Sequence, residues 1–337
     1  MKYIDFDVNG KLISSEKIEK ILDTVPFSNK ILLNTWCNSN FDFECSNGVS
    51  VESFFIEKPW TLLRGNIRRK YFWGNDTIKK LKNTNFIFGS SPFVYTKEIY
   101  DNTIKHLNLY QTVFLPKSDE YCKTQLIQKR SFCREFKNTL LQLNLENPIY
   151  ISWPFDYDYY CRFLPEKITS RMYSIGYNGF DTDWNIKLLK LISYSSELYF
   201  NMISTPCVYS CFLNKNVKFY NSDIQFLPLD VEANINSIYT VDKSKKNDTW
   251  HSFMDYIKRV FQDKTEDLNF WIMNFLSLDL VKSPEELFQD LLTLHNDHTR
   301  LELSFTNNDY YSELIKKVET FKYKNCSKLS HYYYDRL

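Results

Sequence analysis

Three consecutive residues, Ser204, Thr205 and Pro206, have the pattern of a helix start that could bind a phosphate. They follow the strand-like run Glu197 to Asn201. Threonine is a common N-cap residue, and proline suits the first helical position. A helix that starts just after a strand directs free main-chain N–H groups and its positive dipole end above the sheet edge. The Ser204 and Thr205 hydroxyls would add donors, although these residues could also simply start a helix.

Glycines occur at other places where a predicted strand leads into a predicted helix, here called joints. The whole sequence has only seven glycines. Gly176 and Gly179 follow the strand-like run RMYSIG. Gly89 follows the run NFIFG and precedes Ser90, Ser91 and a proline. A glycine at such a joint lets the backbone turn sharply or approach a ligand closely. The two interpretations, a bound ligand and a tight turn with nothing bound, both stay open.

The elements that would position these joints alternate between strands and helices. Strands are expected at Lys30 to Trp36, Asn85 to Gly89, Thr112 to Pro116, Pro148 to Trp153, Arg171 to Gly176, Glu197 to Asn201 and Asn216 to Tyr220. Helices are expected at Thr96 to Leu107, Gln125 to Leu143 and Asp183 to Tyr194. Strands separated by helices predict β-α-β units and a mainly parallel sheet. A further helix should start at Ser283-Pro284-Glu285-Glu286, with serine as its N-cap and acids in its first turn.

Composition narrows the class of protein. The chain has 337 residues, of which 43% are hydrophobic and 25% charged, so a folded core is expected. Lys and Arg total 42 and Asp and Glu total 41, a balance that argues against nucleic acid as a partner. No apolar run is long enough to span a membrane, and the first residues have no apolar signal core, so we expect a cytoplasmic protein. The eight cysteines are scattered, as is typical of reduced thiols.

Several sequence runs, in this order, resemble bacterial surface-polysaccharide glycosyltransferases of the GT-B type, which build capsule or lipopolysaccharide. The runs that carry the resemblance are GSSPFVY, TVFLPKSDEY, PIYISWPFDYDYY, YSIGYNGFDTDW, LYFNMISTPCVYSCFLNKNVKFYN and FWIMNFLSLDLVKSPEEL. They cover roughly residues 80 to 290, as a pattern without an invariant short motif.

The resemblance implies an α/β fold with two Rossmann-like domains that face each other across a cleft. Residues 1–146 would form the acceptor-side domain and residues 147–309 the nucleotide-sugar donor domain. Residues 310–337 would form a helical tail that packs back towards the first domain. The implied activity is transfer of a sugar from a nucleotide-activated donor to a glycan or lipid-linked glycan acceptor. The nucleotide could be a diphosphate or cytidine monophosphate, and peripheral contact with the inner membrane would follow from a lipid-linked acceptor.

The resemblance also assigns residues to the two sides of the cleft. On the donor side, Gly176, Tyr177 and Asn178 would form a wall, Asp156 and Tyr157 would lie at the cleft, and Asn201, Ser204 and Thr205 would bind phosphate. The acceptor side would contain Gly89, Ser90, Ser91, Lys117 and Ser118. Lys117 stands where related chains often have histidine, so Asp119 and Glu120 are the candidates for the base. An inverting transfer needs such a base, and positive groups for the departing phosphate.

Other chemistry is possible at several of these positions. Lys117, Lys215 and the cluster Arg64, Arg68, Arg69 and Lys70 could supply positive charge, or the cluster could be a solvated face. The pair Asp181 and Asp183 could hold a divalent metal in a GT-A transferase, or cap a helix. We expect no metal and no cofactor, because the histidines, including His295 and His298, lack a third ligand. A non-catalytic glycan-binding protein on a transferase-like fold is the remaining alternative.

Overall fold

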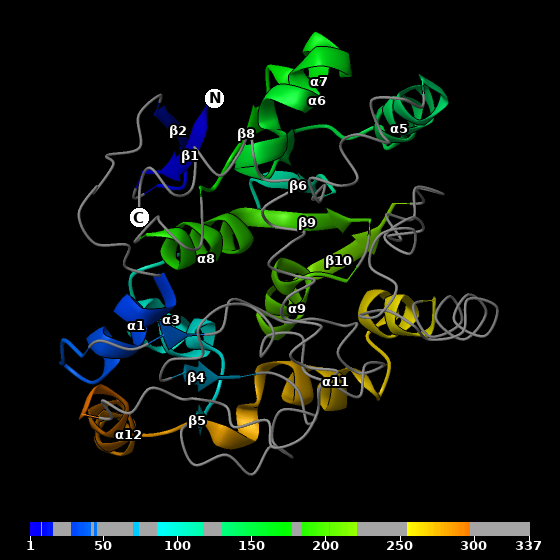
Figure 1. Cartoon of the computed structure of the whole chain (residues 1–337). Helices are drawn as coiled ribbons and strands as arrows, with labels where there is room; N and C mark the ends of the chain where they lie inside the picture. The colour runs from blue at the N-terminus through cyan, green and yellow to red at the C-terminus, as the bar shows by residue number, and fades with distance from the viewer. Residues whose placement is uncertain are drawn as a thin grey trace, which may run out of the picture.

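The structure of the chain, a computed structural model, has a mixed α/β fold with a parallel five-stranded sheet at its centre (Figure 1). It describes residues 1–7, 9–15, 28–41, 44–45, 70–73, 86–116, 130–176, 183–201, 203–220 and 255–296. The five strands are β6 (Tyr110–Phe114), β7 (Pro148–Ile151), β8 (Met172–Tyr173), β9 (Ser195–Phe200) and β10 (Asn216–Phe219). Their spatial order is β10-β9-β6-β7-β8, and every neighbouring pair is parallel.

This strand order is the one in which the chain starts in the middle of the sheet and winds outward in both directions. After β6 the chain adds β7 and β8 on one side, and then returns to add β9 and β10 on the other side. The same order, 3-2-1-4-5 when counted from β6, is found in Rossmann-type sheets. The fold is therefore compatible with the Rossmann-like α/β class that the sequence predicts.

Helices cover both faces of the sheet, as the near-continuous apolar strands require. The connecting helices are α5 (Arg130–Gln142), α6 (Tyr157–Phe163), α7 (Glu166–Thr169), α8 (Trp184–Tyr194) and α9 (Thr205–Phe212). On one face Val113, Tyr150 and Tyr199 pack in a cluster with residues of α5, α6 and α7. The alternate strand residues, which include Phe114, Ile149, Ile151, Leu198, Phe200 and Val217, point to the other face and belong to the cluster of α8 and α9.

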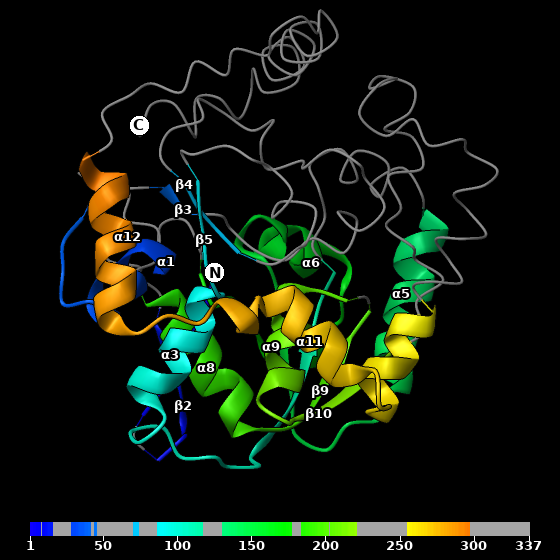
Figure 2. The same ribbon diagram turned by 90° about the horizontal axis from the view of Figure 1, so that it is seen from below.

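A second, three-stranded parallel sheet lies beyond α8 and α9 (Figures 1 and 2). It consists of β3 (Glu44–Cys45), β4 (Lys70–Phe72) and β5 (Phe86–Phe88). The helices near it are α1 (Ser28–Trp36), α3 (Pro92–Tyr100), α11 (Leu268–Leu276) and α12 (Pro284–Asn296). Tyr71 and Trp73 from this side share one buried cluster with α8 and α9, so a continuous core joins the two sheets.

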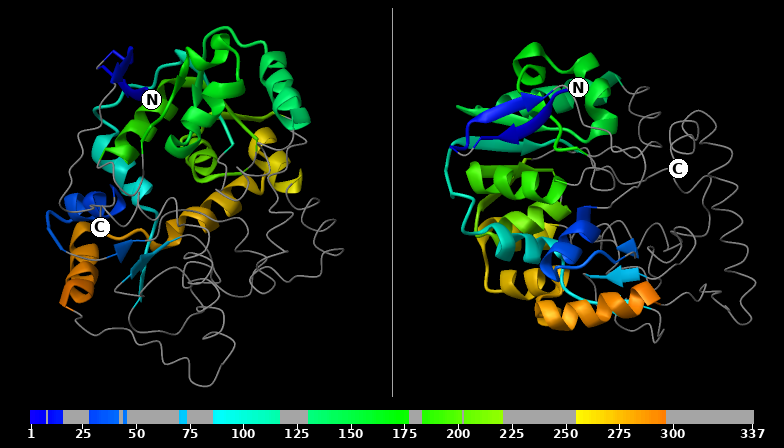
Figure 3. Two further views of the ribbon diagram at one scale, coloured as in Figure 1. Left: turned by 45° about the horizontal axis from the view of Figure 1, so that its top comes forward. Right: turned by 90° about the vertical axis from the view of Figure 1, so that its left-hand side faces the viewer.

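The N-terminal hairpin adds to the outer side of the large sheet. It comprises β1 (Tyr3–Phe6) and β2 (Leu12–Ser15), which are antiparallel. Two main-chain hydrogen bonds, from the Ile4 N–H to the Ser174 carbonyl and from the Ser174 N–H to the Lys2 carbonyl, are each 2.9 Å long. The right-hand view of Figure 3 shows the hairpin above the layer of helices that separates the sheets. The hairpin therefore covers the edge that β8 would otherwise expose.

Most of the expected elements of the central sheet are confirmed, and so is one helix start. Four of the five strands and α8 lie within two residues of their expected bounds, and β8 ends three residues before the expected Gly176. The Ser283 start forms a capping box: the Ser283 N–H donates to a Glu286 carboxylate oxygen at 2.9 Å, and the Glu286 N–H donates to Ser283 Oγ at 3.2 Å. The local chemistry of Ser283, Pro284 and Glu286 is sufficient to define this helix end.

Two predicted elements near the N-terminus differ from the structure. The expected strand from Lys30 to Trp36 was wrong, because this segment lies in α1. Leu32, Leu33 and Cys37 are buried, a spacing that matches one face of a helix. The helix expected at Thr96 to Leu107 begins earlier, at Pro92, and ends at Tyr100. Its actual start is the Ser91-Pro92 pair, a stronger start signal than any residue near Thr96.

The expected domain boundary between residues 146 and 147 falls inside the five-stranded sheet. It separates β6 from β7, yet these strands are paired from Gln111 and Pro148 to Phe114 and Ile151. The large sheet therefore continues across this position. The tail expected at residues 310–337 lies outside the described residues.

Candidate functional site at the carboxyl edge of the large sheet

The strand order creates a topological switch point between β6 and β9. The connection that leaves β6 runs through α5 on one face of the sheet, and the connection that leaves β9 runs through α9 on the opposite face. The two connections therefore diverge at the carboxyl ends of neighbouring strands. In open α/β sheets, ligands bind in the crevice at this switch point. The edge formed by the carboxyl ends of β6 to β10, hereafter the carboxyl edge, is the candidate site.

Helix α9 begins at this edge, where the Ser204-Thr205-Pro206 pattern predicts it. Ser204 is the N-cap residue, and the Val208 N–H donates to its carbonyl at 3.0 Å. The Ser204 side chain makes no capping hydrogen bond and is half-buried. The first N–H groups of a helix have no acceptor within the helix, and α9 starts at the carboxyl edge. The expected N-cap, Thr205, differs by one residue from the observed one.

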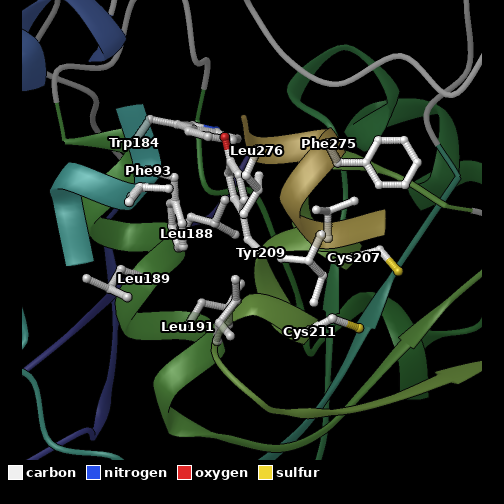
Figure 4. Packing of buried hydrophobic residues seen from close by; sticks show 14 of the residues in the cluster. Phe93, Trp184, Leu188, Leu189, Leu191, Cys207, Tyr209, Cys211, Phe275 and Leu276 are labelled. Atoms are coloured by element: carbon white, nitrogen blue, oxygen red, sulfur yellow. The ribbon is translucent and has the colours of Figure 1, made fainter. Parts of the chain in front are cut away.

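The buried side of α9 fixes the orientation of this helix start. Cys207 and Val208 are fully buried, and Tyr209 stacks on Phe93 with ring centroids 3.8 Å apart (Figure 4). Burial raises the pKa of the Cys207 thiol well above its ordinary value, as does its hydrogen bond with Cys211. This thiol is therefore a neutral core group. With the apolar side of α9 anchored, the half-buried Ser204 lies at the start of the helix.

Three more residues predicted for the donor side lie at the same edge, but all three are buried. Asp156 follows β7, ends the 3-10 helix Pro154–Asp156 and has an exposed fraction of 0%. The Tyr157 hydroxyl donates to the Met172 carbonyl at 3.2 Å, and burial raises the pKa of this hydroxyl. Gly176 follows β8 with a φ of 87°, a left-handed conformation that favours glycine. Of the three, only Gly176 has a backbone geometry that the residue type explains.

Three of the residues predicted for the acceptor side, Gly89, Ser90 and Ser91, form a closed joint between β5 and α3. Ser90 and Ser91 have exposed fractions of 0%. Ser90 Oγ donates to the Leu276 carbonyl at 2.9 Å, and Ser91 Oγ lies 3.0 Å from the Tyr209 hydroxyl. A Cβ atom at Gly89 would lie 1.9 Å from the Tyr71 hydroxyl, so glycine is required here by packing. These three residues connect the two sheets and do not line an open surface.

Lys215 lies at the opposite end of the large sheet from the helix start of α9. It precedes β10, and its Nζ donates to the carbonyls of Ser193 and Ser195 at 2.7 and 3.0 Å. These carbonyls lie at the end of α8, where a cation is favourable. The suggestion that Lys215 supplies positive charge to a phosphate is therefore wrong: its ammonium group caps a helix at the amino edge.

A lysine that sequence reasoning missed lies at the carboxyl edge. Residues 255–263 are helical, and Lys258 in this helix has its Nζ 5.9 Å from the centroid of the Phe219 ring at the end of β10. Burial lowers the pKa of Lys258, and the nearby Asp255 has the opposite, smaller effect. No motif marks this position, since only the packing of the helix against β10 brings Lys258 to the edge.

The remaining predicted residues lie outside the described part of the chain. These are Lys117, Ser118, Asp119, Glu120, Tyr177, Asn178, Gly179 and Asp181, together with Arg64, Arg68, Arg69 and His298. The chain leads to Lys117 from Pro116, whose carbonyl accepts a hydrogen bond from the Tyr160 hydroxyl at 2.6 Å at the end of β6. Asn201 immediately follows β9 and is half-buried.

The structure offers no support for a metal site within the residues that it describes. No group of three or more His, Cys, Asp or Glu side chains among them could hold a metal ion. Asp183 is the N-cap residue of α8, as expected for a helix start, although its side chain makes no capping hydrogen bond. In the same part of the chain, no helix is both long and apolar enough to cross a membrane.

Comparison with known proteins gives no relative: no family model, no curated protein and no solved structure matches this chain. The geometry of the carboxyl edge is therefore the basis for the function proposed below.

Proposed function

We propose that the protein is a glycosyltransferase that moves a sugar from a nucleotide-activated donor to a glycan acceptor of the cell surface. The observation that carries the proposal is the start of α9 at the switch point of a Rossmann-like sheet. There, the N-terminal end of α9 lies at the carboxyl edge, and the half-buried Ser204 side chain makes no capping hydrogen bond. This arrangement suits the phosphate groups of a nucleotide.

In this proposal the chain supplies two kinds of group to the reaction. A carboxylate, Asp119 or Glu120, accepts the proton of an acceptor hydroxyl while that oxygen forms a bond to the anomeric carbon. The bond between the anomeric carbon and the phosphate oxygen breaks, and the nucleotide leaves with the electron pair. The positive end of α9 then stabilises the charge that develops on the leaving phosphate. Neither step requires a metal, and the transfer inverts the configuration at the anomeric carbon.

The two-domain GT-B arrangement is part of the same proposal. The donor unit would be built on the five-stranded sheet, which includes β6. The three-stranded sheet with α1, α3 and α12 would belong to the acceptor side. The contacts of α12 with α1 and β5 support this grouping, since they return the chain to the smaller sheet. We also propose that the protein works in the cytoplasm, in contact with a lipid-linked acceptor at the inner membrane.

Thermal unfolding in the presence of nucleotides tests the proposal. UDP, GDP, dTDP and CMP are each added, with and without Mn²⁺. A nucleotide at about 100 times its dissociation constant should stabilise the fold by about 2.7 kcal/mol. We expect a metal-independent shift in melting temperature for one nucleotide, and loss of most of that shift in the variant Ser204→Ala/Thr205→Ala.

The matched control is Ser210→Ala, which removes a hydroxyl from the other end of α9. Ser210 Oγ donates to the Pro206 carbonyl at 2.7 Å inside the helix, so this variant should keep the nucleotide shift. A shift that requires Mn²⁺ would instead favour a GT-A transferase. Absence of a shift with every nucleotide would contradict the proposal and favour a glycan-binding protein.

Activity measurements test the proposed base. Asp119→Asn and Glu120→Gln remove one carboxylate each without a large change in size. Loss of general base catalysis typically lowers a rate by about 10²- to 10⁴-fold. We expect this loss of kcat in one variant only, with nucleotide binding unchanged in both. Wild-type kcat in both variants would exclude these carboxylates as the base.

A further inference from the structure

Helix α11 is apolar on its outer side as well as on the side that packs into the core. Its nine residues, LNFWIMNFL, include only two polar ones, Asn269 and Asn274. The helix contacts α9, and it lies below α9 in Figure 1 and in front of α9 in Figure 2. The residues that it buries in the core are Leu268, Ile272, Phe275 and Leu276. A surface helix normally has a polar outer side, so the apolar outer side of α11 indicates a further contact.

The outer side of α11 exposes two large hydrophobic side chains to solvent. Phe270 is 60% exposed, more than any other large hydrophobic residue that the structure describes, and Met273 is 46% exposed. The two residues lie about one helical turn apart, on neighbouring positions of the helix surface. The half-buried Trp271 lies beside Phe270, with ring centroids 5.4 Å apart. Phe270, Trp271 and Met273 are hereafter called the α11 face.

The exposed charges at the two ends of α11 are mainly negative. The exposed acids are Asp263, Glu266, Asp267 and Asp279. The two lysines of the same segment have partners elsewhere, because Lys264 donates to the Asn214 side chain at 2.9 Å and Lys282 forms an ion pair with Asp290. Like charges in contact are unfavourable, so these acids disfavour an anionic lipid surface and a second copy of the same face. They favour a partner with basic residues around an apolar centre.

We propose that the α11 face binds a basic amphipathic helix of another protein. Apolar side chains of the partner, spaced by three or four residues, pack against Phe270 and Met273. Lysine and arginine residues on the flanks of the partner helix lie opposite Asp263 and Glu266. These charges increase the association rate and select against acidic partners. The interaction adds a protein partner to the substrates proposed above and does not depend on them.

Two labelled synthetic helices test the proposal. Both peptides have about 18 residues, a length at which an isolated helix can form, and both carry the same leucine-rich side. The remaining positions are lysine and arginine in the basic peptide and glutamate in the acidic peptide. Fluorescence anisotropy gives the dissociation constant of each peptide for the full chain.

Three double variants locate the binding surface. The first removes the two exposed side chains of the α11 face, the second removes two of the acids, and the third is a matched control that removes two exposed hydrophobic side chains elsewhere. They are Phe270→Ser/Met273→Ser, Asp263→Asn/Glu266→Gln and Ile13→Ser/Leu141→Ser. All six side chains are exposed, so each variant should melt within a few degrees of the wild type, which checks that the fold is kept.

We expect the basic peptide to bind the wild type about 10-fold or more tightly than the acidic peptide. Phe270→Ser/Met273→Ser should weaken this binding by about 10-fold or more, while the control variant changes it little. Asp263→Asn/Glu266→Gln should weaken it by about 3-fold at low salt and by less at about 0.15 M salt. Equal affinities for the two peptides, or an equal loss in the control variant, would overturn the proposal.

Two further measurements distinguish other occupants of the α11 face. Sedimentation velocity detects self-association, and flotation with vesicles of phosphatidylcholine and phosphatidylglycerol in equal amounts detects lipid binding. Self-association or vesicle binding that is lost in Phe270→Ser/Met273→Ser, without binding of the basic peptide, would overturn the proposal in favour of a second copy or a membrane. Failure of the wild type to bind either peptide would overturn it as well.

Discussion

Two strand-to-helix joints with nearly the same sequence differ in how deeply their side chains are buried. Ser90-Ser91-Pro92 starts α3 after β5, and Ser204-Thr205-Pro206 starts α9 after β9. At the first joint both serines are fully buried and their hydroxyls bond within the protein. At the second joint the Ser204 side chain is half-buried and makes no capping bond. The same Ser-x-Pro pattern is therefore closed by packing in one place and less deeply buried in the other.

The reason for the difference is what lies above each joint. Above the first joint, Tyr71 donates its hydroxyl hydrogen to the Ser90 carbonyl at 2.8 Å, and the end of α11 supplies the Leu276 carbonyl. These groups occupy the position that a ligand would take. The second joint lies at the point where the sheet connections diverge, and among the described residues the packing is on its inner side.

Substitution of Gly89 should give the largest effect on stability. In Gly89→Ala the new Cβ would lie 1.9 Å from the Tyr71 hydroxyl and 2.5 Å from the ring carbon that bears it. Since Tyr71 is fully buried, the ring must move and its hydrogen bond to Ser90 must weaken. We expect the free energy of unfolding in urea to fall by about 3 kcal/mol. A loss below about 0.5 kcal/mol, the range of an ordinary surface substitution, would mean that the packing around Gly89 accommodates a methyl group without strain.

A pair of serine variants should show an intermediate effect at the closed joint. Ser91→Ala removes the contact with the Tyr209 hydroxyl and the cap on the Phe93 N–H at 3.3 Å. We expect this variant to lose about 1–2 kcal/mol of unfolding free energy in urea. Ser204→Ala should change that free energy by less than about 0.5 kcal/mol, because no hydrogen bond is lost.

Ser204→Ala should affect nucleotide binding more than Ser91→Ala does, which is the opposite of their order in stability. If a nucleotide stabilises the wild type, Ser204→Ala should reduce that stabilisation and Ser91→Ala should leave it unchanged. The same thermal unfolding assay measures both. A reduced nucleotide shift in Ser91→Ala with a full shift in Ser204→Ala would contradict the assignment of the nucleotide site to the start of α9.

The smallest effect should come from a pH-dependent contact of Glu197, which lies on β9 of the large sheet. Burial raises the pKa of Glu197, but hydrogen bonds from Lys218, Tyr199 and Gln111 outweigh it and hold this pKa below 4.5. The ionised carboxylate therefore stabilises the fold above pH 4.5, and this contribution disappears as the pH falls through the lowered pKa.

Glu197→Gln tests this contact against the closed joint. The variant should lose about 1 kcal/mol or less at neutral pH and approach wild-type stability in acid. The loss in Ser91→Ala should be the same at both pH values, because hydroxyl groups do not titrate between about pH 3 and pH 7. Urea unfolding at several pH values measures both variants. A pH-independent loss in Glu197→Gln would indicate that its charge is irrelevant to folding.

The sequence by itself determined the elements whose signals are local. The apolar runs of the central strands, the amphipathic spacing of α8 and the capping residues at Ser283 act within a few residues, so their patterns were sufficient. The run from Lys30 to Trp36 was ambiguous, since a short apolar segment suits a buried strand or one face of a helix. It became α1 because Leu32, Leu33 and Cys37 pack on one side.

Only the tertiary structure decided how deeply each helix start is buried. The burial of Ser91 depends on Tyr209, 118 residues away, and the position of Lys258 depends on the contact of Gln262 with Phe219. The strand order that creates the switch point is likewise set by long-range pairing of β6 with β9. Hydrogen bonds and packing between residues so far apart leave no local pattern in the chain. The sequence therefore specified the helix starts, and the fold determined how deeply each of them is buried.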